Sequence, residues 1–321
     1  MFLYQKNKIL ASLSEISNLT HHRHSSRVVD MIEPSIYSIS KADARWPSLL
    51  HELPTKAQPK QLYIQGQLPP SDALIVAVVG TRKPSNYGKD ATVEIVRALA
   101  HHRIVIASGM ALGIDSIAHK TALEENTLTI AVLGCGLDQS VIYPKGNIAL
   151  AEKICANGGA LVSEYSPDQK PELWTFPQRN RIIAGIAKAI IVIEAGEKSG
   201  ALITARFATE YNRDVLALPG QIFNSQAQGT NILIKQGATP ITSPDDILEV
   251  LGLETNSIKS TEKNYATPEE EKILAALNES ESLDTIIKQT KLPANIVLAS
   301  TTLLEIRGMI KNIGGGLYRK I

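Results

Sequence analysis

The chain has 321 residues, with 33 lysines and arginines against 32 aspartates and glutamates, so its formal net charge is only +1. This balance excludes nucleic-acid binding by overall basicity, and any such binding needs local clusters of cations. Two cysteines, Cys135 and Cys155, are too few for a disulfide framework and lie in no metal-type spacing. The longest apolar runs are of strand length and cannot span a membrane. We expect a soluble, cytoplasmic protein with reduced thiols.

Residues 1–70 show little hydrophobic periodicity. Histidines and an arginine at 21–24 are typical of a loop, and prolines recur from Pro34 to Pro70. We expect this segment to be an N-terminal extension that packs on the main domain.

Residues 71–251 alternate short apolar runs with longer helical stretches. Because the runs are apolar throughout, they are typical of strands buried on both faces. This order predicts an α/β fold, an extended Rossmann-like parallel sheet with helices on both faces. The predicted strands are Leu74–Val79, Ile104–Ala107, Thr129–Leu133, Ala160–Ser163, Ala189–Ile193 and Val215–Leu218. The predicted helices lie near Asp90–Ala100, Ser116–Glu124, Ile148–Asn157, Ile182–Ala187 and Ala201–Tyr211.

The C-terminal part is predicted to be a separate module. Residues 252–266 are polar and indicate a linker, whereas residues 267–321 combine helix signals with a glycine-rich hairpin, the layout of a winged helix. The candidate recognition helix, Ala294–Glu305, has no arginine or lysine before Arg307 and would read bases poorly. We expect a protein-contact or weak DNA-contact module.

The segments that follow the predicted strands are rich in glycine, serine and basic residues. In open α/β sheets ligands bind at this edge, where backbone N–H groups converge on an anion. One phosphate needs one such loop, whereas several loops at one edge favour an extended polyanion or a large nucleotide. We expect side-chain contacts to phosphates from Arg82, Lys83, Arg179 and Arg181, and backbone contacts from Ser108, Gly109, Ser199 and Gly200.

Two aromatic residues, Tyr143 and Phe176, lie near the same predicted edge and are candidates for base stacking. The alternative for Phe176 is a hydrophobic plug beneath its loop. We expect residues 176–181 to belong to a long loop between the fourth strand and the next helix.

Signatures of nucleotide-dependent enzymes are missing from the sequence. It holds no G-x-G-x-x-G, no G-x-x-x-x-G-K-[ST] and no G-x-S-x-G, and so does not support NAD binding, P-loop ATP hydrolysis or serine-hydrolase chemistry. Asp115 and His119 share one helix face, and we interpret them as a cap and a packing histidine rather than a catalytic pair. Cys135 is interpreted as a small buried thiol. We expect no cofactor and no catalytic activity.

Six strand-end segments form a series along the chain. They are Val79–Arg82 with Tyr87 and Gly88, Ser108–Asp115, Ala131–Gly136, Tyr143 and Pro144 with Asn147, Phe176–Gly185, and Glu194 and Ala195 followed by Ser199–Ala205. This series resembles the DNA-processing protein A family (DprA, also called Smf). The resemblance covers about residues 40–250, and the C-terminal module is similar to the family's optional winged helix. Many members carry a helical domain at the N-terminus, and we do not expect residues 1–35, which are short and unpatterned, to form a complete one.

The resemblance implies an extended Rossmann fold that binds single-stranded DNA, forms a homodimer and loads the RecA recombinase onto DNA in natural transformation. It implies no catalytic activity, and it adds Asn147 and Asn180 to the candidate DNA contacts. Because the chain shows no base-reading helix, we expect little sequence preference.

Two alternatives come from other classes. A phosphoribohydrolase on a related fold carries a P-G-G-x-G-T loop followed by a glutamate, whereas Glu197–Thr204 stands here without that glycine run. A regulatory sensor would bind a nucleotide on the sheet and an operator through the winged helix, and the uncharged recognition helix argues against it.

Overall fold

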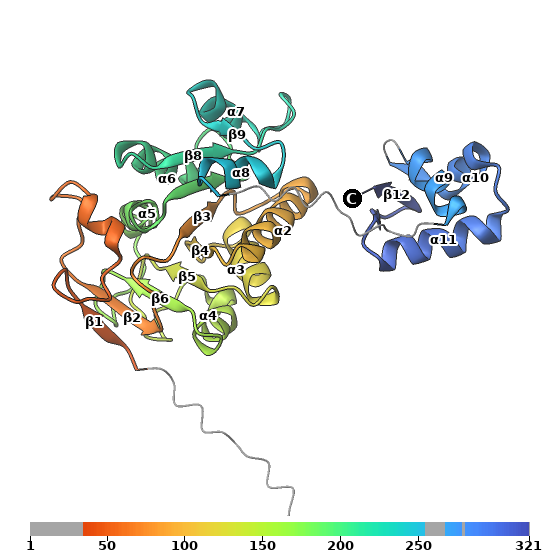
Figure 1. Ribbon diagram of the computed structural model, residues 1–321. Helices are drawn as coiled ribbons and strands as arrows, with labels where there is room; N and C mark the ends of the chain where they lie inside the picture. The colour runs from red at the N-terminus through yellow and green to blue at the C-terminus, as the bar shows by residue number, and fades with distance from the viewer. Residues whose placement is uncertain (1–34, 254–266, 278–279, 321) are drawn as a thin grey trace, which may run out of the picture. The chain divides into compact units, whose positions relative to one another are not determined.

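A computed structural model describes residues 35–253, 267–277 and 280–320 (Figure 1). The chain divides into two compact units, Met1–Leu253 and Glu254–Ile321. The first 34 residues and nearly all of the predicted linker lie outside the described residues, and the predictions made for them stay predictions.

One sheet organises the first unit. Its nine strands, among the residues described, run in the order β1-β2-β6-β5-β4-β3-β7-β8-β9. Neighbours from β6 to β9 are parallel, whereas the pairs β1–β2 and β2–β6 are antiparallel. This confirms the predicted parallel α/β sheet. The strands are β1 (Tyr37–Ile39), β2 (Leu62–Gly66), β3 (Ile75–Val79), β4 (Val105–Ser108), β5 (Thr129–Val132), β6 (Ala160–Ser163), β7 (Ala189–Val192), β8 (Asp214–Ala217) and β9 (Thr239–Pro240).

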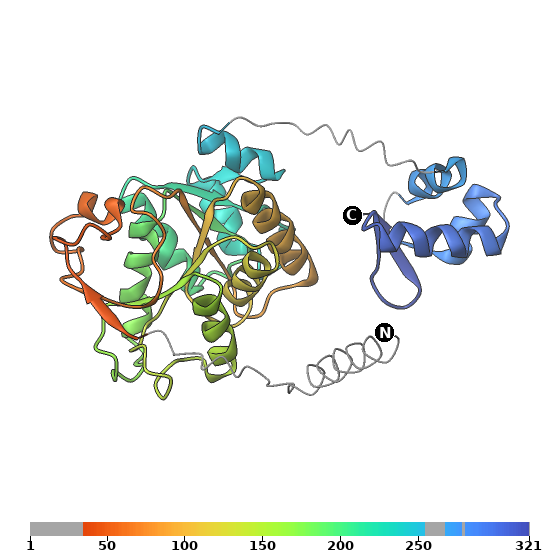
Figure 2. The same cartoon turned by 60° about the horizontal axis from the view of Figure 1, so that its bottom comes forward.

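Helices cover both faces of this sheet, as Figures 1 and 2 show. One face carries α2 (Asn86–His101), α3 (Ile114–Glu124), α4 (Ile148–Ala156) and α8 (Pro244–Val250). The other carries α5 (Thr175–Ile186), α6 (Gly200–Glu210) and the short 3-10 helix η1 (Ser48–Glu52). The remaining elements are α7 (Gln228–Lys235) after β8 and η2 (Lys145–Asn147) before α4.

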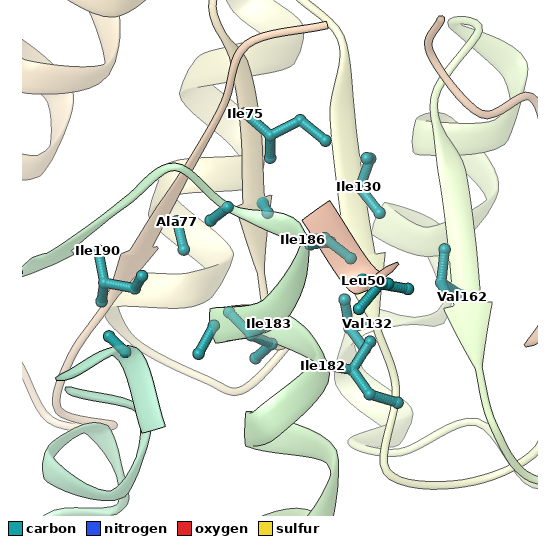
Figure 3. Close-up of a cluster of buried hydrophobic side chains, with 14 of the residues drawn as sticks. Leu50, Ile75, Ala77, Ile130, Val132, Val162, Ile182, Ile183, Ile186 and Ile190 are labelled. Atoms are coloured by element: carbon teal, nitrogen blue, oxygen red, sulfur yellow. The ribbon is translucent and has the colours of Figure 1, made fainter. Parts of the chain in front are cut away.

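Alternate residues of each central strand face opposite layers. In β3, Ala77 and Val79 belong to one buried cluster, whereas Val76 and Val78 belong to the other. This two-sided burial explains why the strands read as continuous apolar runs. Figure 3 shows the first cluster, in which Ile75, Ala77, Ile130, Val132, Val162 and Ile190 of the sheet meet Leu50, Ile182, Ile183 and Ile186.

The predicted N-terminal extension is partly built into the sheet. Residues 37–39 and 62–66 form β1 and β2, and Leu62 and Ile64 are fully buried with Tyr63 between them half-buried. This alternation is a strand signal, but it is only five residues long and lies between prolines, so the pattern alone does not predict it.

The predicted loop at 176–181 is wrong, because this segment forms the first half of α5. Pro177 is the third residue of that helix. Proline is tolerated there because first-turn N–H groups have no partner within the helix.

The second unit is a winged helix, as predicted. It comprises α9 (Pro268–Ala276), α10 (Leu283–Thr290) and α11 (Ala294–Ile306) with a sheet ordered β10 (Glu281–Ser282), β12 (Leu317–Lys320) and β11 (Ile310–Asn312). Its buried centre includes Ile273, Ile286, Val297 and Leu304. A capping box between Thr267 and Glu270 starts α9.

Candidate nucleic-acid interface

The sheet has its topological switch point at β3, which lies between β4 and β7. The chain leaves β3 for α2 on one face and leaves β7 for α6 on the other, an arrangement that opens a crevice at the strands' carboxyl ends. A cleft of about 1210 Å³ lies there. Its lining includes Thr81, Arg82, Lys83, Tyr143, Trp174, Phe176, Arg179, Asn180, Lys198, Ser199 and Gly200.

Exposed cations line the cleft from both of these loops. Arg82 and Lys83 follow β3, and Lys198 follows β7; all three are exposed and form no ion pair with a described side chain. Arg82 and Lys83 therefore lie where the sequence predicts them. Lys198 is missing from the predicted set, although it immediately precedes the predicted Ser199.

A buried carboxylate ties the two loops together. Glu194, 2% exposed at the end of β7, accepts hydrogen bonds from the backbone N–H of Ser85 at 2.8 Å and from its hydroxyl at 2.5 Å. The Ser85 hydroxyl oxygen in turn accepts from the N–H of Gly88 and caps α2. A Cβ at Gly88 would lie 2.4 Å from the Glu194 carboxylate, so this position leaves no room for a side chain. The cation-bearing loop is thereby held before any ligand arrives.

Arg179 lies beneath the cleft rather than on its rim. It is 5% exposed, and its Nη1 donates to the carbonyl oxygens of Gly109, at 2.7 Å, and Val132. Burial lowers the pKa of Arg179, and the nearby Asp115 carboxylate opposes that shift. A guanidinium engaged in this way is no mobile phosphate ligand, and the prediction for Arg179 is corrected on that ground.

Asp115 occupies the anion position predicted at the end of β4. Its Oδ2 accepts from the N–H groups of Gly109 at 3.1 Å and Ala111 at 3.2 Å. Burial raises the pKa of Asp115, whereas Arg179 and these hydrogen bonds lower it. Ser108 is fully buried, and its hydroxyl donates to Val78 O. The protein's own carboxylate thus fills the backbone site predicted at Ser108 and Gly109.

Two further predicted contacts lie away from the cleft surface. Arg181 donates to the Glu164 carboxylate and to Ala57 O, and its side chain is 12% exposed. Asn147, 4% exposed, donates from Nδ2 to Met110 O at 2.7 Å and to the Ser116 hydroxyl. Both side chains are used within the protein, so neither fits the predicted role of a DNA contact.

Ser199, Gly200 and Asn180 stay on the cleft wall. Ser199 caps α6, because its Oγ accepts from the N–H of Ala201, and its own N–H donates to Gly196 O. Asn180 donates to Gly200 O at 3.2 Å, which links α5 to the start of α6. Of this group, Gly200 is exposed and lines the cleft at the first residue of α6.

Aromatic side chains gather on one wall of the cleft. The rings of Tyr143 and Phe176 lie 5.7 Å apart at 55°, and Tyr143 is 46% exposed. Trp174, 53% exposed, lines the same cleft, with its ring edge-on to Tyr165 and its indole N–H donating to Glu172. Phe176 is half-buried and also lines the cleft, so the stacking role stays a prediction beside the plug. Trp174 is absent from the predicted set, because it precedes the motif at 176–181 and carries no periodic signal.

Asp115 and His119, which the sequence analysis interprets as structural residues, both have structural roles in the fold. His119 is fully buried and its Nδ1 lies 2.7 Å from the Thr129 hydroxyl, while burial lowers the pKa of His119 to about 3. Asp115 accepts hydrogen bonds from N–H groups of the loop before α3, at Gly109 and Ala111, and does not cap the helix itself. Cys135 is buried, as predicted, and burial raises the pKa of its thiol.

Two family models match the chain. The model of DNA recombination-mediator protein A matches residues 37–252, and that of the DprA winged helix domain matches residues 259–316. The chain belongs to this family. The resemblance found in the strand-end segments is thereby confirmed.

Relatives extend the match over most of the chain. Protein Smf of Escherichia coli is 39% identical over 276 residues, which cover 83% of this chain and 73% of that relative. DNA processing protein A from Streptococcus pneumoniae superposes with a TM-score of 0.62 at 39% identity, over 67% of this chain and 74% of that one. The Helicobacter pylori protein gives a TM-score of 0.59 at 33% identity, over 68% and 95% respectively, and is described as having a single-stranded DNA binding mode.

Metal and membrane signals are absent from the part of the chain that the structure describes. No cluster of His, Cys, Asp and Glu there could hold a metal ion. None of its helices is both long and apolar enough to cross a bilayer.

Proposed function

We propose that the protein binds single-stranded DNA in the cleft at the carboxyl ends of β3 and β7, with little sequence preference. The observation that carries this proposal is the pairing of exposed cations on two loops with an aromatic wall. Single-strand binders combine these two features, because cations follow the phosphates while aromatic rings accept unstacked bases. The side chains left for this role are Arg82, Lys83, Lys198, Tyr143, Trp174 and Phe176, with Asn180 and the Gly200 backbone beside them.

Sequence preference is expected to be weak because stacking accepts any base. The winged helix adds no base reader, since α11 has no cation between Ala294 and Ile306. The single-strand binding described for the Helicobacter pylori relative supports the same class of ligand.

We further propose that the protein is a homodimer that loads the RecA recombinase onto single-stranded DNA, in natural transformation and recombination. Family membership as a recombination mediator supports this role. The helices α6 and α7, late in the sheet order, are the candidates for the dimer contact. A RecA assay tests the loading: RecA-dependent ATP hydrolysis on single strands coated with single-strand-binding protein should start sooner when this protein is added.

Fluorescence anisotropy with labelled oligo-dT and a duplex of equal length tests the DNA proposal. We expect tighter binding to the single strand. Each phosphate contact on a single strand adds about −0.7 to the slope of log affinity against log salt, so three exposed cations predict a slope of about −2. Arg82→Ala should make the slope shallower by about 0.7. Exposed Lys120 does not line the cleft, and Lys120→Ala is the matched control. Equal affinity for the duplex, or equal slopes for the two variants, would contradict the proposal.

A further inference from the structure

Helices α5 and α6 lie side by side on one face of the sheet, and both begin at the cleft (Figure 1). Asn180 of α5 donates to Gly200 O of α6 at 3.2 Å and so joins the two helices near the rim. Ile183 follows Asn180 by three residues and Thr204 follows Gly200 by four, so each stands about one turn deeper on the same side of its helix. Both still line the cleft and belong to its floor.

The hydroxyl of Thr204 has no partner within the described part of the protein. The residue is only 1% exposed, and its side chain forms no hydrogen bond with any group that the structure describes. A helical threonine can donate to the carbonyl oxygen four residues earlier, as Thr92 does to Gly88 O at 2.6 Å. For Thr204 that acceptor is Gly200 O, which accepts from Asn180 instead. Because this hydroxyl is not enclosed by other atoms, the small surface that Thr204 exposes lies on the cleft floor.

The surroundings of this hydroxyl suit a neutral ring rather than a phosphate. The cleft-lining neighbours along the two helices, Ile183, Ala201 and Ile203, are apolar. The exposed cations belong to the loops at the rim, and the charge of Arg179 beneath the cleft is already opposed by Asp115. A phosphate on the floor would therefore lose its hydration without gaining a free cation. A base would lose little, because its ring meets apolar side chains and its polar edge meets a hydroxyl.

We propose that the floor of the cleft holds one unstacked base of the bound strand, and that the Thr204 hydroxyl forms a hydrogen bond with that base. The inference rests on the single-strand binding proposed above and names a residue for it. A hydroxyl both donates and accepts, so it can pair with a polar edge of any base. Space is sufficient, since clefts of about 300–1,000 Å³ take drug-sized ligands and this one measures about 1210 Å³.

The free protein should keep its stability when this hydroxyl is removed. Thr204→Val keeps the shape of the side chain and breaks no hydrogen bond within the described residues, while it takes a polar atom out of a buried position. The urea midpoint of Thr204→Val should therefore equal or exceed that of the wild type. A hydroxyl that served the fold would give the opposite result, because its loss would leave a partner unsatisfied.

Anisotropy with two labelled strands of equal length, oligo-dT and an abasic strand, tests the contact with the base. Thr204→Val should weaken oligo-dT binding about three- to tenfold, the factor that corresponds to one neutral hydrogen bond. On the abasic strand, at a salt concentration where the wild type binds it, Thr204→Val should match the wild type. Thr204→Ser keeps the hydroxyl and should bind oligo-dT as the wild type does.

Thr209→Val is the matched control, because Thr209 also lies on α6 but is exposed and does not line the cleft. The proposal is overturned if Thr204→Val binds oligo-dT as tightly as Thr209→Val, or if it weakens binding to both strands equally. Thymidine 5′-monophosphate, at the same concentration of nucleotide units, should not displace the strand, since one phosphate cannot engage cations on both loops; equal displacement would assign the floor to a free nucleotide. Failure of the proposed function would look different, because the wild type itself would then bind duplex as tightly as single strand.

Discussion

Replacing Arg179 with methionine separates a buried structural cation from a DNA contact. The substitution keeps most of the side-chain volume but removes the charge opposite Asp115 and the donors to Gly109 O and Val132 O. Leaving a buried polar group without its hydrogen-bond partner costs about 1–3 kcal/mol. Asp115 keeps its two backbone N–H donors, whereas Gly109 O and Val132 O lose theirs, so we expect a loss of about 3 kcal/mol in the free energy of unfolding at pH 7.5.

The loss should depend on pH with a defined sign. Burial raises the pKa of Asp115 in the folded state above its unfolded value, so its ionisation weakens the fold as pH rises. Without Arg179 that pKa rises further. The deficit of Arg179→Met relative to wild type should therefore be larger at pH 8 than at pH 5. Adding Asp115→Asn should recover part of it, because the stranded charge is removed.

Urea unfolding followed by tryptophan fluorescence measures these differences. Both tryptophans, buried Trp46 and cleft-lining Trp174, lie in the first unit, so the signal reports that unit alone. Anisotropy with oligo-dT, without urea, provides the second readout: Arg179→Met should keep the wild-type salt slope. The reasoning is refuted if Arg179→Met leaves stability within about 0.5 kcal/mol of wild type and flattens the slope as Arg82→Ala does.

Three other predictions follow from the site. Trp174→Ala should weaken oligo-dT binding by about 1–3 kcal/mol in anisotropy titrations without changing the salt slope, since stacking carries no charge; a changed slope would argue against stacking. His119 is buried in its neutral form, with a pKa of about 3 in the folded protein against about 6.5 when unfolded, so the stability that depends on the neutral ring is lost as pH falls through that window. On lowering the pH, the urea midpoint of the wild type should therefore fall more than that of His119→Gln. A chain ending at Leu253 should keep most single-strand affinity, because every cleft-lining residue precedes it; loss of binding by a folded fragment would place the DNA site on the winged helix.

The central strands were predictable from sequence because both faces of the parallel sheet are covered. Each strand is therefore a continuous apolar run that can be recognised by itself, without knowledge of the strands beside it. Short edge strands carry less signal, and β1 has only three residues. Exposed Arg82 and Lys83 were also predictable, since a loop after a buried strand must come to the surface.

The prediction placed Arg179 on the surface, although the sequence holds a pattern that indicates its burial. Positions 179, 182, 183 and 186 repeat at helical spacing, and three of them are isoleucines in the core. With Pro177 accepted as a first-turn residue, the pattern places Arg179 on the buried face. The occupation of the Gly109 backbone site by Asp115 is a local contact, but the sequence interpretation assigned Asp115 to capping the helix that follows rather than the loop before it.

The polar groups at this edge of the sheet divide into two kinds. Glu194 and Asp115 satisfy backbone donors of the loops, while Arg179 satisfies carbonyls beneath them. Arg82, Lys83 and Lys198 line the cleft and form no ion pair with any side chain that the structure describes. The buried groups carry their desolvation cost in the free protein, so the loops need little reorganisation when a ligand binds. Loss of DNA binding on mutation is therefore no proof of contact: at Arg179 it would follow from a collapsed loop, whereas at Arg82 it would report a phosphate. Only the salt slope, measured beside stability, distinguishes the two.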